Sequence, residues 1–420
     1  MADDSAEGRR LSPNLIAGAI IAAFTIAAVL WQQPWQGEAT TKKPPVSADA
    51  GVLIASQIRS IGRARTEQEF VTAAGDSKAA RDWSKETYAN ISLLGATDIR
   101  LRFVSGGASG VRADGGTEAK VEVSWRPGPQ TGLNQAQTGD AVVTFVLDPV
   151  KNGKFAIRDT RRDSGALPLW LAGKLDISRG NGSTVISIDG GDTGKPIADE
   201  ADIAHAAVRK VVKSVTATLV VISPHTQQQT AALLDQSATS VEQIAAVTTT
   251  LDDSSSANAA TLIVLNPLVF EGMDERAAQI VMSHEATHLM TKAVTADIET
   301  WVAEGFADFV ALHDDAAPLS VSAGQILRSV KKDGAPAQLP TAADFGTTQH
   351  GLGGTYESAW LIFRMLGERY ADADIVRFYD AVLGGTSTAK AAESAFGLSI
   401  GDITGEWRAY LAVKSASITS

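Results

Sequence analysis

Residues 280–308 read IVMSHEATHLMTKAVTADIETWVAEGFAD, and the interpretation of the whole chain starts from this stretch. It opens with an H-E-x-x-H pattern formed by His284, Glu285 and His288. Residues four apart share one face of a helix, so this spacing predicts that both imidazoles point toward one position. Two neutral imidazoles and a carboxylate are a common catalytic zinc shell that leaves the fourth position for water. Glu285 lies on a neighbouring face, where a carboxylate can take a proton from that water without binding the metal.

Glu304 is the predicted third ligand, because the gap after His288 is long enough to end one helix, turn and begin another. Asp308 follows four residues later and can reach a ligand histidine, which would fix the tautomer of that ring. The alternative interpretation is a solvated helix that happens to carry two histidines. The whole chain has only six His, so a chance H-E-x-x-H is rare, and the downstream E-G-x-A-D pattern makes it rarer.

The sequence resembles the gluzincin metallopeptidases, the thermolysin-like superfamily. Its W-x-x-E-G-x-A-D-F pattern over residues 301–309 is similar to the pattern of membrane-anchored bacterial members of that superfamily. The zincin variant with a Met-turn is excluded, since it requires Gly at Thr291 and His at Val294. One departure from thermolysin is the shorter gap between His288 and Glu304, which predicts a tight connection between the two helices.

The resemblance implies a catalytic domain with a sheet-bearing upper half, a helical lower half and Zn²⁺ between them. Glu285 would be the general base, and Tyr356 the donor to the oxyanion, with His350 and His313 as alternatives. The apolar helix beside Tyr356 is expected from Glu357 to Tyr370, after a turn at Gly353 and Gly354. It also implies that the strand nearest the cleft pairs with an extended peptide substrate. We assign that place to Thr261–Leu265; the alternative is an ordinary strand of the sheet.

Toward the N-terminus, Leu15–Trp31 is an uninterrupted apolar run without charge, long enough to span a bilayer. We expect residues 1–36 to form a cytoplasmic tail and a transmembrane helix that anchors the chain in the cell membrane. The flanking charges favour an extracytoplasmic catalytic domain. A cleaved signal peptide is the alternative, although no convincing cleavage site precedes the polar linker at 37–47.

The remaining chain is expected to be α+β. Residues 48–165 show helical periodicity and then four alternating segments, which predicts helices followed by an antiparallel sheet. This order resembles the cone-shaped fold of the nuclear transport factor two family. Residues 166–182 are expected to be a linker, and 183–415 the metallopeptidase domain, in which Asp274 caps the H-E-x-x-H helix and Gly305 allows close helix packing.

The composition of the chain restricts which kinds of binding partner and metal ligand are expected. The net charge of −11 argues against nucleic acid, and the absence of cysteine leaves only His and carboxylates as metal ligands. The expected partner is a peptide or protein substrate. Two other functions stay open: a zinc-binding pseudoenzyme or sensor, and a scaffold protein of the cell envelope. Retention of Glu285 argues against the pseudoenzyme, because a structural metal site has no use for a general base.

Overall fold

The computed structural model describes residues 48–418 apart from 107–115, 151–153, 191–192, 253, 257 and 347–351. These residues form a mixed α+β structure with two β-sheets, as the sequence predicts. The expected transmembrane segment Leu15–Trp31 and the linker at 37–47 lie outside the described residues. Within the described part of the chain, no helix is both long enough and apolar enough to cross a bilayer.

The N-terminal part has three helices followed by a four-stranded antiparallel sheet in the order β1-β2-β3-β4, so the predicted order is confirmed. Its elements are α3 (Ala48–Arg63), α4 (Glu67–Ala74), α5 (Lys78–Leu94), β1 (Thr97–Gly106), β2 (Thr117–Arg126), β3 (Gly139–Pro149) and β4 (Phe155–Ser164). Alternate residues of β2, among them Val121, Val123 and Trp125, are buried in a core that also holds Ile54 and Ile58 of α3. The period-two pattern of the sequence therefore marks the face of the sheet that meets the helices.

The second sheet has five strands in the order β5-β6-β7-β9-β8. The strands are β5 (Leu175–Arg179), β6 (Ser183–Ile188), β7 (Leu219–Ser223), β8 (Ala246–Thr250) and β9 (Thr261–Leu265). Strands β6, β7 and β9 are parallel, and β5 and β8 are the antiparallel edges. Residues 166–182, expected to be a linker, contain β5, which forms a hairpin with β6. The sequence of β5 is short and weakly apolar, and this segment becomes a strand because it pairs with β6.

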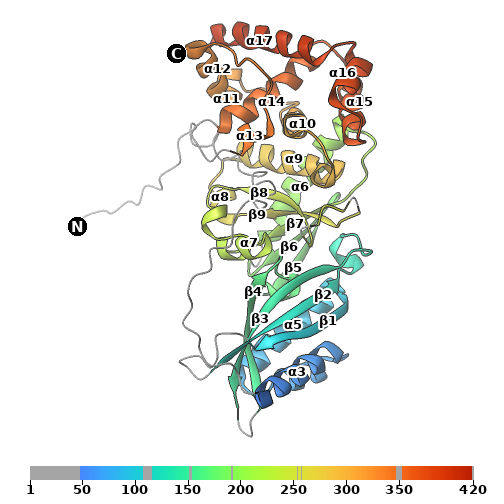
Figure 1. Cartoon of the computed structure of the whole chain (residues 1–420), viewed down its shortest axis with the longest axis vertical. Coiled ribbons are helices and arrows are strands. Elements are labelled where there is room, and N and C mark those ends of the chain that lie inside the picture. Colours follow the sequence, from blue (N-terminus) through green and yellow to red (C-terminus); the bar gives the residue numbers. More distant parts are fainter. Residues whose placement is uncertain are drawn as a thin grey trace, which may run out of the picture.

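Alternate residues of this sheet face two different cores. Val185, Val221 and Ile263 belong to the core that also contains the helix with the H-E-x-x-H pattern. Ile186, Val220 and Val264 belong to a core shared with the N-terminal helices and the first sheet. The second sheet is thus covered on both faces, and one of its covers is the N-terminal part of the chain (Figure 1).

A buried hydrogen-bond cluster reinforces this contact. The Asn90 side chain of α5 donates to the carbonyls of Trp170 (3.3 Å) and Gly173 (2.7 Å) and accepts from the Leu175 N–H (3.1 Å). A single buried amide thereby satisfies three backbone groups at the start of β5. The two parts are packed together directly, and residues 166–182, expected to be a linker, take part in this packing.

The C-terminal half is helical and lies above the second sheet in Figure 1. The helices around the second sheet are α6 (Gly194–Val211), α7 (Gln227–Leu233), α8 (Pro267–Phe270) and α9 (Glu275–Thr291). Beyond them lie α10 (Thr300–Ala311), α11 (Leu319–Ser322), α12 (Gly324–Asp333), α13 (Ala342–Phe345), α14 (Leu352–Gly367), α15 (Asp372–Leu383), α16 (Thr388–Phe396) and α17 (Ile400–Ser417). Helix α9 lies between the sheet and this helical layer, and its residues from Ile280 to Thr291 are all buried.

Helix α14 differs from its predicted form. It begins at Leu352, whereas the sequence pattern predicted a start at Glu357 after a turn at Gly353 and Gly354. Both glycines are helical, and a Cβ at Gly353 would lie 2.1 Å from the Gln325 amide nitrogen of α12. Both glycines lie within the helix, so the predicted turn is wrong.

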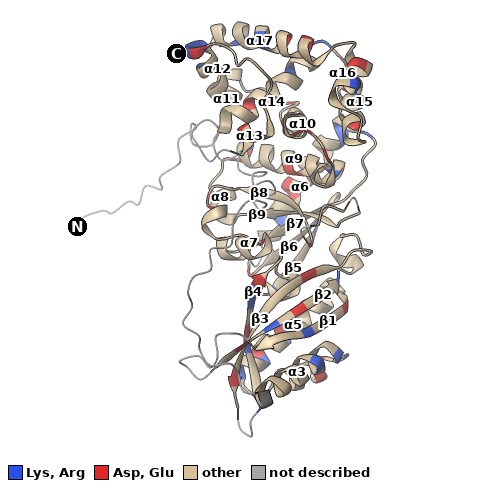
Figure 2. Cartoon of the chain, in the orientation of Figure 1, with Lys and Arg blue, Asp and Glu red and all other residues tan. Residues whose placement is uncertain are grey.

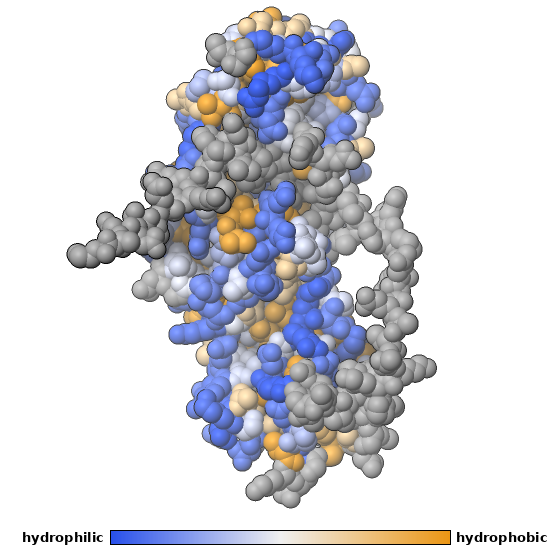
Figure 3. All heavy atoms as spheres, turned by 90° about the vertical axis from the view of Figure 1, so that its left-hand side faces the viewer, coloured by the Kyte–Doolittle hydropathy of each residue, from blue (hydrophilic) through white to orange (hydrophobic). Residues whose placement is uncertain are grey.

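Both signs of charge are spread over the molecule (Figure 2), and opposite charges pair across strands of the first sheet, as Lys120 and Asp163 do at 2.8 Å. The face drawn in Figure 3 is mostly hydrophilic where it is described, with small apolar patches. Leu268 of α8, 68% exposed, is one of the exposed apolar side chains. The described apolar residues are otherwise largely in the two cores.

Candidate metal centre

Helix α9 positions the two histidines. Its first turn is capped by Asp274, whose side chain accepts from the Ala277 N–H at 2.8 Å, which confirms the predicted cap. The helix ends where Lys292 adopts a left-handed conformation, φ 61°, and its N–H bonds the carbonyls of the last turn. Between these ends His284 and His288 stand one turn apart on one face, with ring centroids 4.6 Å apart.

Helix α10 brings the carboxylate to them. A Cβ at Gly305 would lie 2.6 Å from the Ala359 carbonyl oxygen of α14, so only glycine lets α10 approach α14 this closely. The predicted role of Gly305 in close packing is confirmed. The neighbouring Glu304 then faces α9, with Oε2 3.1 Å from His284 Nε2 and 3.5 Å from His288 Nε2.

One potential ligand atom from each of His284, His288 and Glu304 lies within 4.8 Å of the other two, and all three residues are buried. The Nε2 atoms of the two histidines are 2.9 Å apart. The group could therefore hold a metal ion. The Oε1 atom of Glu304 is buried and has no hydrogen-bond partner among the described residues, as expected of a carboxylate whose partner is a cation. Two imidazoles with one carboxylate fit zinc better than magnesium or calcium, which prefer oxygen ligands.

The three groups polarise one another. Burial alone would raise the pKa of Glu304, but the adjacent His288 and His284 outweigh it and lower the pKa to about 2. Burial alone would lower the pKa of His284, whereas the Asp308 and Glu304 carboxylates raise it well above its usual value. The site thus favours an ionised Glu304 carboxylate beside a positive charge. A bound cation can supply that charge, and so can a proton on a histidine.

Asp308 lies where the sequence predicts. Its Oδ1 atom is 2.7 Å from His284 Nδ1, one helical turn beyond Glu304. A hydrogen bond donated by Nδ1 to this carboxylate fixes the tautomer in which Nε2 carries a free lone pair. Asp308 therefore orients His284 toward the position shared with His288 and Glu304.

Glu285 is buried and is held by the edge strand β8. Its Oε2 atom accepts from the backbone N–H of Thr248 (2.8 Å) and from the Thr248 hydroxyl (2.7 Å). Burial raises the pKa of Glu285, although His284, His288 and the Thr248 hydroxyl act in the opposite direction. Neither β8 nor Thr248 was predicted from the sequence.

The strand assigned to substrate pairing is not an edge. The predicted bounds of Thr261–Leu265 match β9, but β9 is flanked by β7 on one side and β8 on the other. Both of its hydrogen-bonding sides are used, so it cannot accept a further strand. The assignment of β9 to substrate pairing is therefore wrong, and β8 is the edge strand next to α9.

Tyr356 lies on α14 close to the histidines. Its ring centroid is 6.5 Å from that of His284 and packs edge-on against Phe345 at 5.0 Å. Of the two alternatives, His350 lies outside the described residues. His313 contacts Asp314 (3.2 Å) and Asp372 (3.0 Å) at the end of α10, apart from the metal cluster. Tyr356 thus remains the assigned residue that the structure brings near the cluster.

Sequence reasoning missed Glu357, which follows Tyr356 on α14. It is buried, and its carboxylate accepts from the Ile326 N–H of α12 at 2.7 Å. Burial raises the pKa of Glu357 to about 8, against the effect of backbone donors and Arg328. A glutamate in an apolar helix gives no signal in the sequence, because its partner is a backbone N–H supplied by another helix.

Glu357 makes stability depend on pH. Because its folded-state pKa lies above the value of 4.5 for an exposed glutamate, the folded chain keeps a proton that the unfolded chain releases as pH rises from 4.5 to about 8. The unfolding free energy of the metal-free chain should therefore fall across this window. In Glu357→Gln, which retains an oxygen for the Ile326 N–H, the fall should shrink, on the order of a few kcal/mol. Urea unfolding of both proteins at several pH values measures this; parallel curves would contradict it.

Comparison of the chain with protein-family models finds no match, and searches of curated proteins and of solved structures find none either. The interpretation of the site therefore stands on its residues and geometry.

Proposed function

We propose that this chain is a zinc-dependent peptidase. The observation that supports it is the buried group His284, His288 and Glu304 with Glu285 beside it on α9. Two imidazoles and a carboxylate are the ligand set of a catalytic zinc, and a purely structural site does not need the adjacent carboxylate.

Zinc held by these three residues would lower the pKa of a water molecule and polarise the scissile carbonyl. Glu285 then accepts the proton of that water and passes it to the leaving amine. Asp308 keeps His284 in the ligating tautomer, and Tyr356 donates a hydrogen bond to the developing oxyanion. Peptide or protein is the substrate, and Leu15–Trp31 tethers the chain to the membrane with the catalytic part extracytoplasmic.

The test uses the full-length chain purified from membranes in detergent. Its metal content is measured, and hydrolysis of an unfolded protein substrate is followed with and without a chelator. We expect about one zinc per chain, chelator-sensitive hydrolysis and recovery with added zinc. Zinc without hydrolysis would favour the pseudoenzyme, and no bound metal would overturn the proposal. Recovery of the chain only in the soluble fraction of cells would overturn the tether alone.

The contact between Thr248 and Glu285 makes a further prediction. Thr248→Val removes the hydroxyl donor and keeps the shape of the side chain, so the Glu285 carboxylate loses one of its two donors on β8. We expect kcat to fall about 10- to 100-fold with unchanged zinc content, since a hydrogen bond to a charged group is lost. Thr248→Ser should restore most of the rate. Thr249→Val, on the opposite face of β8, is the matched control; an equal loss there would mean that the strand was disturbed.

A further inference from the structure

A second concave site lies on the flank of α6. It is a cavity of about 560 Å³ between α6 and the β5–β6 turn, residues 180–182. The face of α6 that carries Ala201, Ala204 and Val208 packs into the core with α9. The cavity opens on a different face of the helix, so it is separate from the metal centre.

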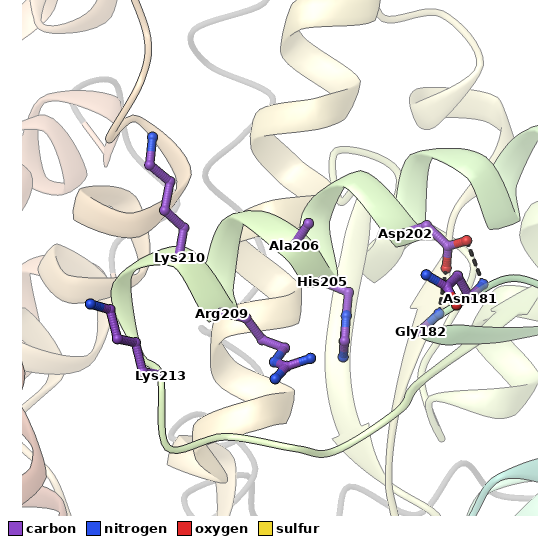
Figure 4. A pocket seen from close by; sticks show the side chains of 8 residues that line it. All are labelled: Asn181, Gly182, Asp202, His205, Ala206, Arg209, Lys210 and Lys213. Carbon is purple, nitrogen blue, oxygen red and sulfur yellow. Dashed lines mark hydrogen bonds between the residues drawn. The ribbon is translucent and has the colours of Figure 1, made fainter.

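The lining is basic although the chain is acidic. Four of its side chains carry or can acquire positive charge: His205, Arg209, Lys210 and Lys213. His205 and Arg209 are four residues apart on α6, which places them along one stripe, whereas Lys213 follows the end of the helix at Val211. Figure 4 shows the side chains of His205 and Arg209 extending to the same side of α6, whereas the Lys213 side chain, on the turn after the helix, extends away from them in this view. In a chain with a net charge of −11, this is a local reversal of sign.

The one acidic group of the lining is already occupied. Asp202 accepts from the backbone N–H groups of Asn181 (2.6 Å) and Gly182 (2.9 Å) and from the Ser183 hydroxyl (2.7 Å). These bonds to the β5–β6 turn outweigh burial and lower the pKa of Asp202, so it stays ionised as part of the turn. It is held at the end of the cavity near His205, whose charge it can offset, while Arg209 and Lys213 lie toward the other end (Figure 4).

The basic residues differ in their partners. Lys210 forms an ion pair with Asp314 at 2.6 Å. Within the described part of the chain, no ion pair involves Arg209 or Lys213. Cations in the last turn of a helix also complement its dipole, which accounts for Arg209 and Lys210. It does not account for Lys213 beyond the helix end, for His205 a turn earlier, or for the concave shape.

The β5–β6 turn is built around His205. A Cβ at Gly182 would lie 2.4 Å from His205 Nδ1, so the missing side chain leaves room for the imidazole against the turn. The ring is half-buried, while Arg209 and Lys213 are exposed. One half-buried donor and two longer cations suit a ligand with several acceptor oxygens pointing in different directions. A tetrahedral phosphate has that geometry, and the Arg guanidinium matches two of its oxygens.

We propose that this cavity binds a phosphate group through His205, Arg209 and Lys213. The group belongs either to a small phosphorylated solute or free phosphate, or to the headgroup of an anionic lipid. Both sources present the same oxygens to the same side chains. The site is independent of the metal centre and of the proposed hydrolysis.

The test titrates the full-length chain in detergent with inorganic phosphate by calorimetry. We expect a Kd below about 1 mM and a loss of about 10- to 100-fold in the double variant Arg209→Gln/Lys213→Gln, since two charge-assisted contacts are removed. The matched control is Lys195→Gln/Lys390→Gln, which removes two positive charges from exposed positions outside the cavity. Circular dichroism and metal content establish that both variants fold.

A parallel arm distinguishes the two sources. Flotation with vesicles of phosphatidylcholine, with or without phosphatidylglycerol, compares the wild type with both double variants. Phosphate binding that only the Arg209/Lys213 variant loses supports a soluble ligand. Recovery on phosphatidylglycerol vesicles that only this variant loses, without binding of free phosphate, supports the lipid headgroup. Absence of both effects, or equal effects in the control, overturns the proposal.

Discussion

Glu285→Gln should lower kcat by about 10²–10⁴-fold and leave zinc bound, because it removes the general base and no ligand. Glutamine keeps an oxygen that can accept from the Thr248 N–H and hydroxyl, so the contact between α9 and β8 survives. The expected result is an enzyme with a normal metal content, a normal unfolding midpoint and almost no turnover. Steady-state kinetics and metal analysis on the same preparation measure both quantities.

Glu275→Gln is the matched control, since Glu275 is exposed in the first turn of the same helix. It should have the kinetics of the wild type. If metal content fell together with activity in Glu285→Gln, Glu285 would contribute to binding of the metal and its assigned role would be wrong. Near-normal turnover would show that another group accepts the proton.

Tyr356→Phe should lower kcat by about 10²–10³-fold, the size expected for one lost oxyanion donor. Phenylalanine keeps the ring, which packs against Phe345 and faces His284, and removes only the hydroxyl. A donor that acts in the transition state lowers kcat and kcat/KM together, with little change in the binding of substrate. Zinc content should not change.

A tyrosine that serves only packing would tolerate this substitution at a near-normal rate, and that result would end the assignment. His313→Ala is the comparison variant, because His313 contacts Asp314 and Asp372 at the end of α10. It should leave kcat unchanged. A larger loss there than in Tyr356→Phe would transfer the role.

The sequence predicts the grouping of His284, His288 and Glu304 well because its determinants are local. The spacing of His284 and His288 on a helix and the cap at Asp274 depend only on helix geometry. Glu304 and Asp308 are likewise one turn apart on a second helix. Only the contact between the two helices depends on tertiary structure, and the close packing of the second helix against α14 at Gly305 helps to position it.

What the sequence did not predict depends on contacts between distant segments. Strand β8 reads Ala-Val-Thr-Thr-Thr, a pattern with little alternation, and it becomes a strand by pairing with β9, which follows a polar loop. Without β8, the sequence predicts that β9 pairs with a substrate, which the position of β9 between β7 and β8 excludes. The partner of Glu357 is likewise a backbone N–H on another helix, to which no residue pattern corresponds. The segment Leu15–Trp31, expected to cross the membrane, and His350 lie outside the described residues, so what the sequence predicts of them stays a prediction.

The core shared by the two sheets has a consequence for folding. Ile186, Val220 and Val264 of the second sheet are buried under the N-terminal part, and Asn90 ties that part to β5. Cutting the chain near residue 165 would expose this apolar face to water, so the C-terminal half should not be a stable fragment by itself. The two parts should therefore melt as one cooperative unit, with a single transition in scanning calorimetry. Proteolytic maturation that discards the N-terminal part would destroy the metal centre along with the fold, and two separate melting transitions would show the opposite.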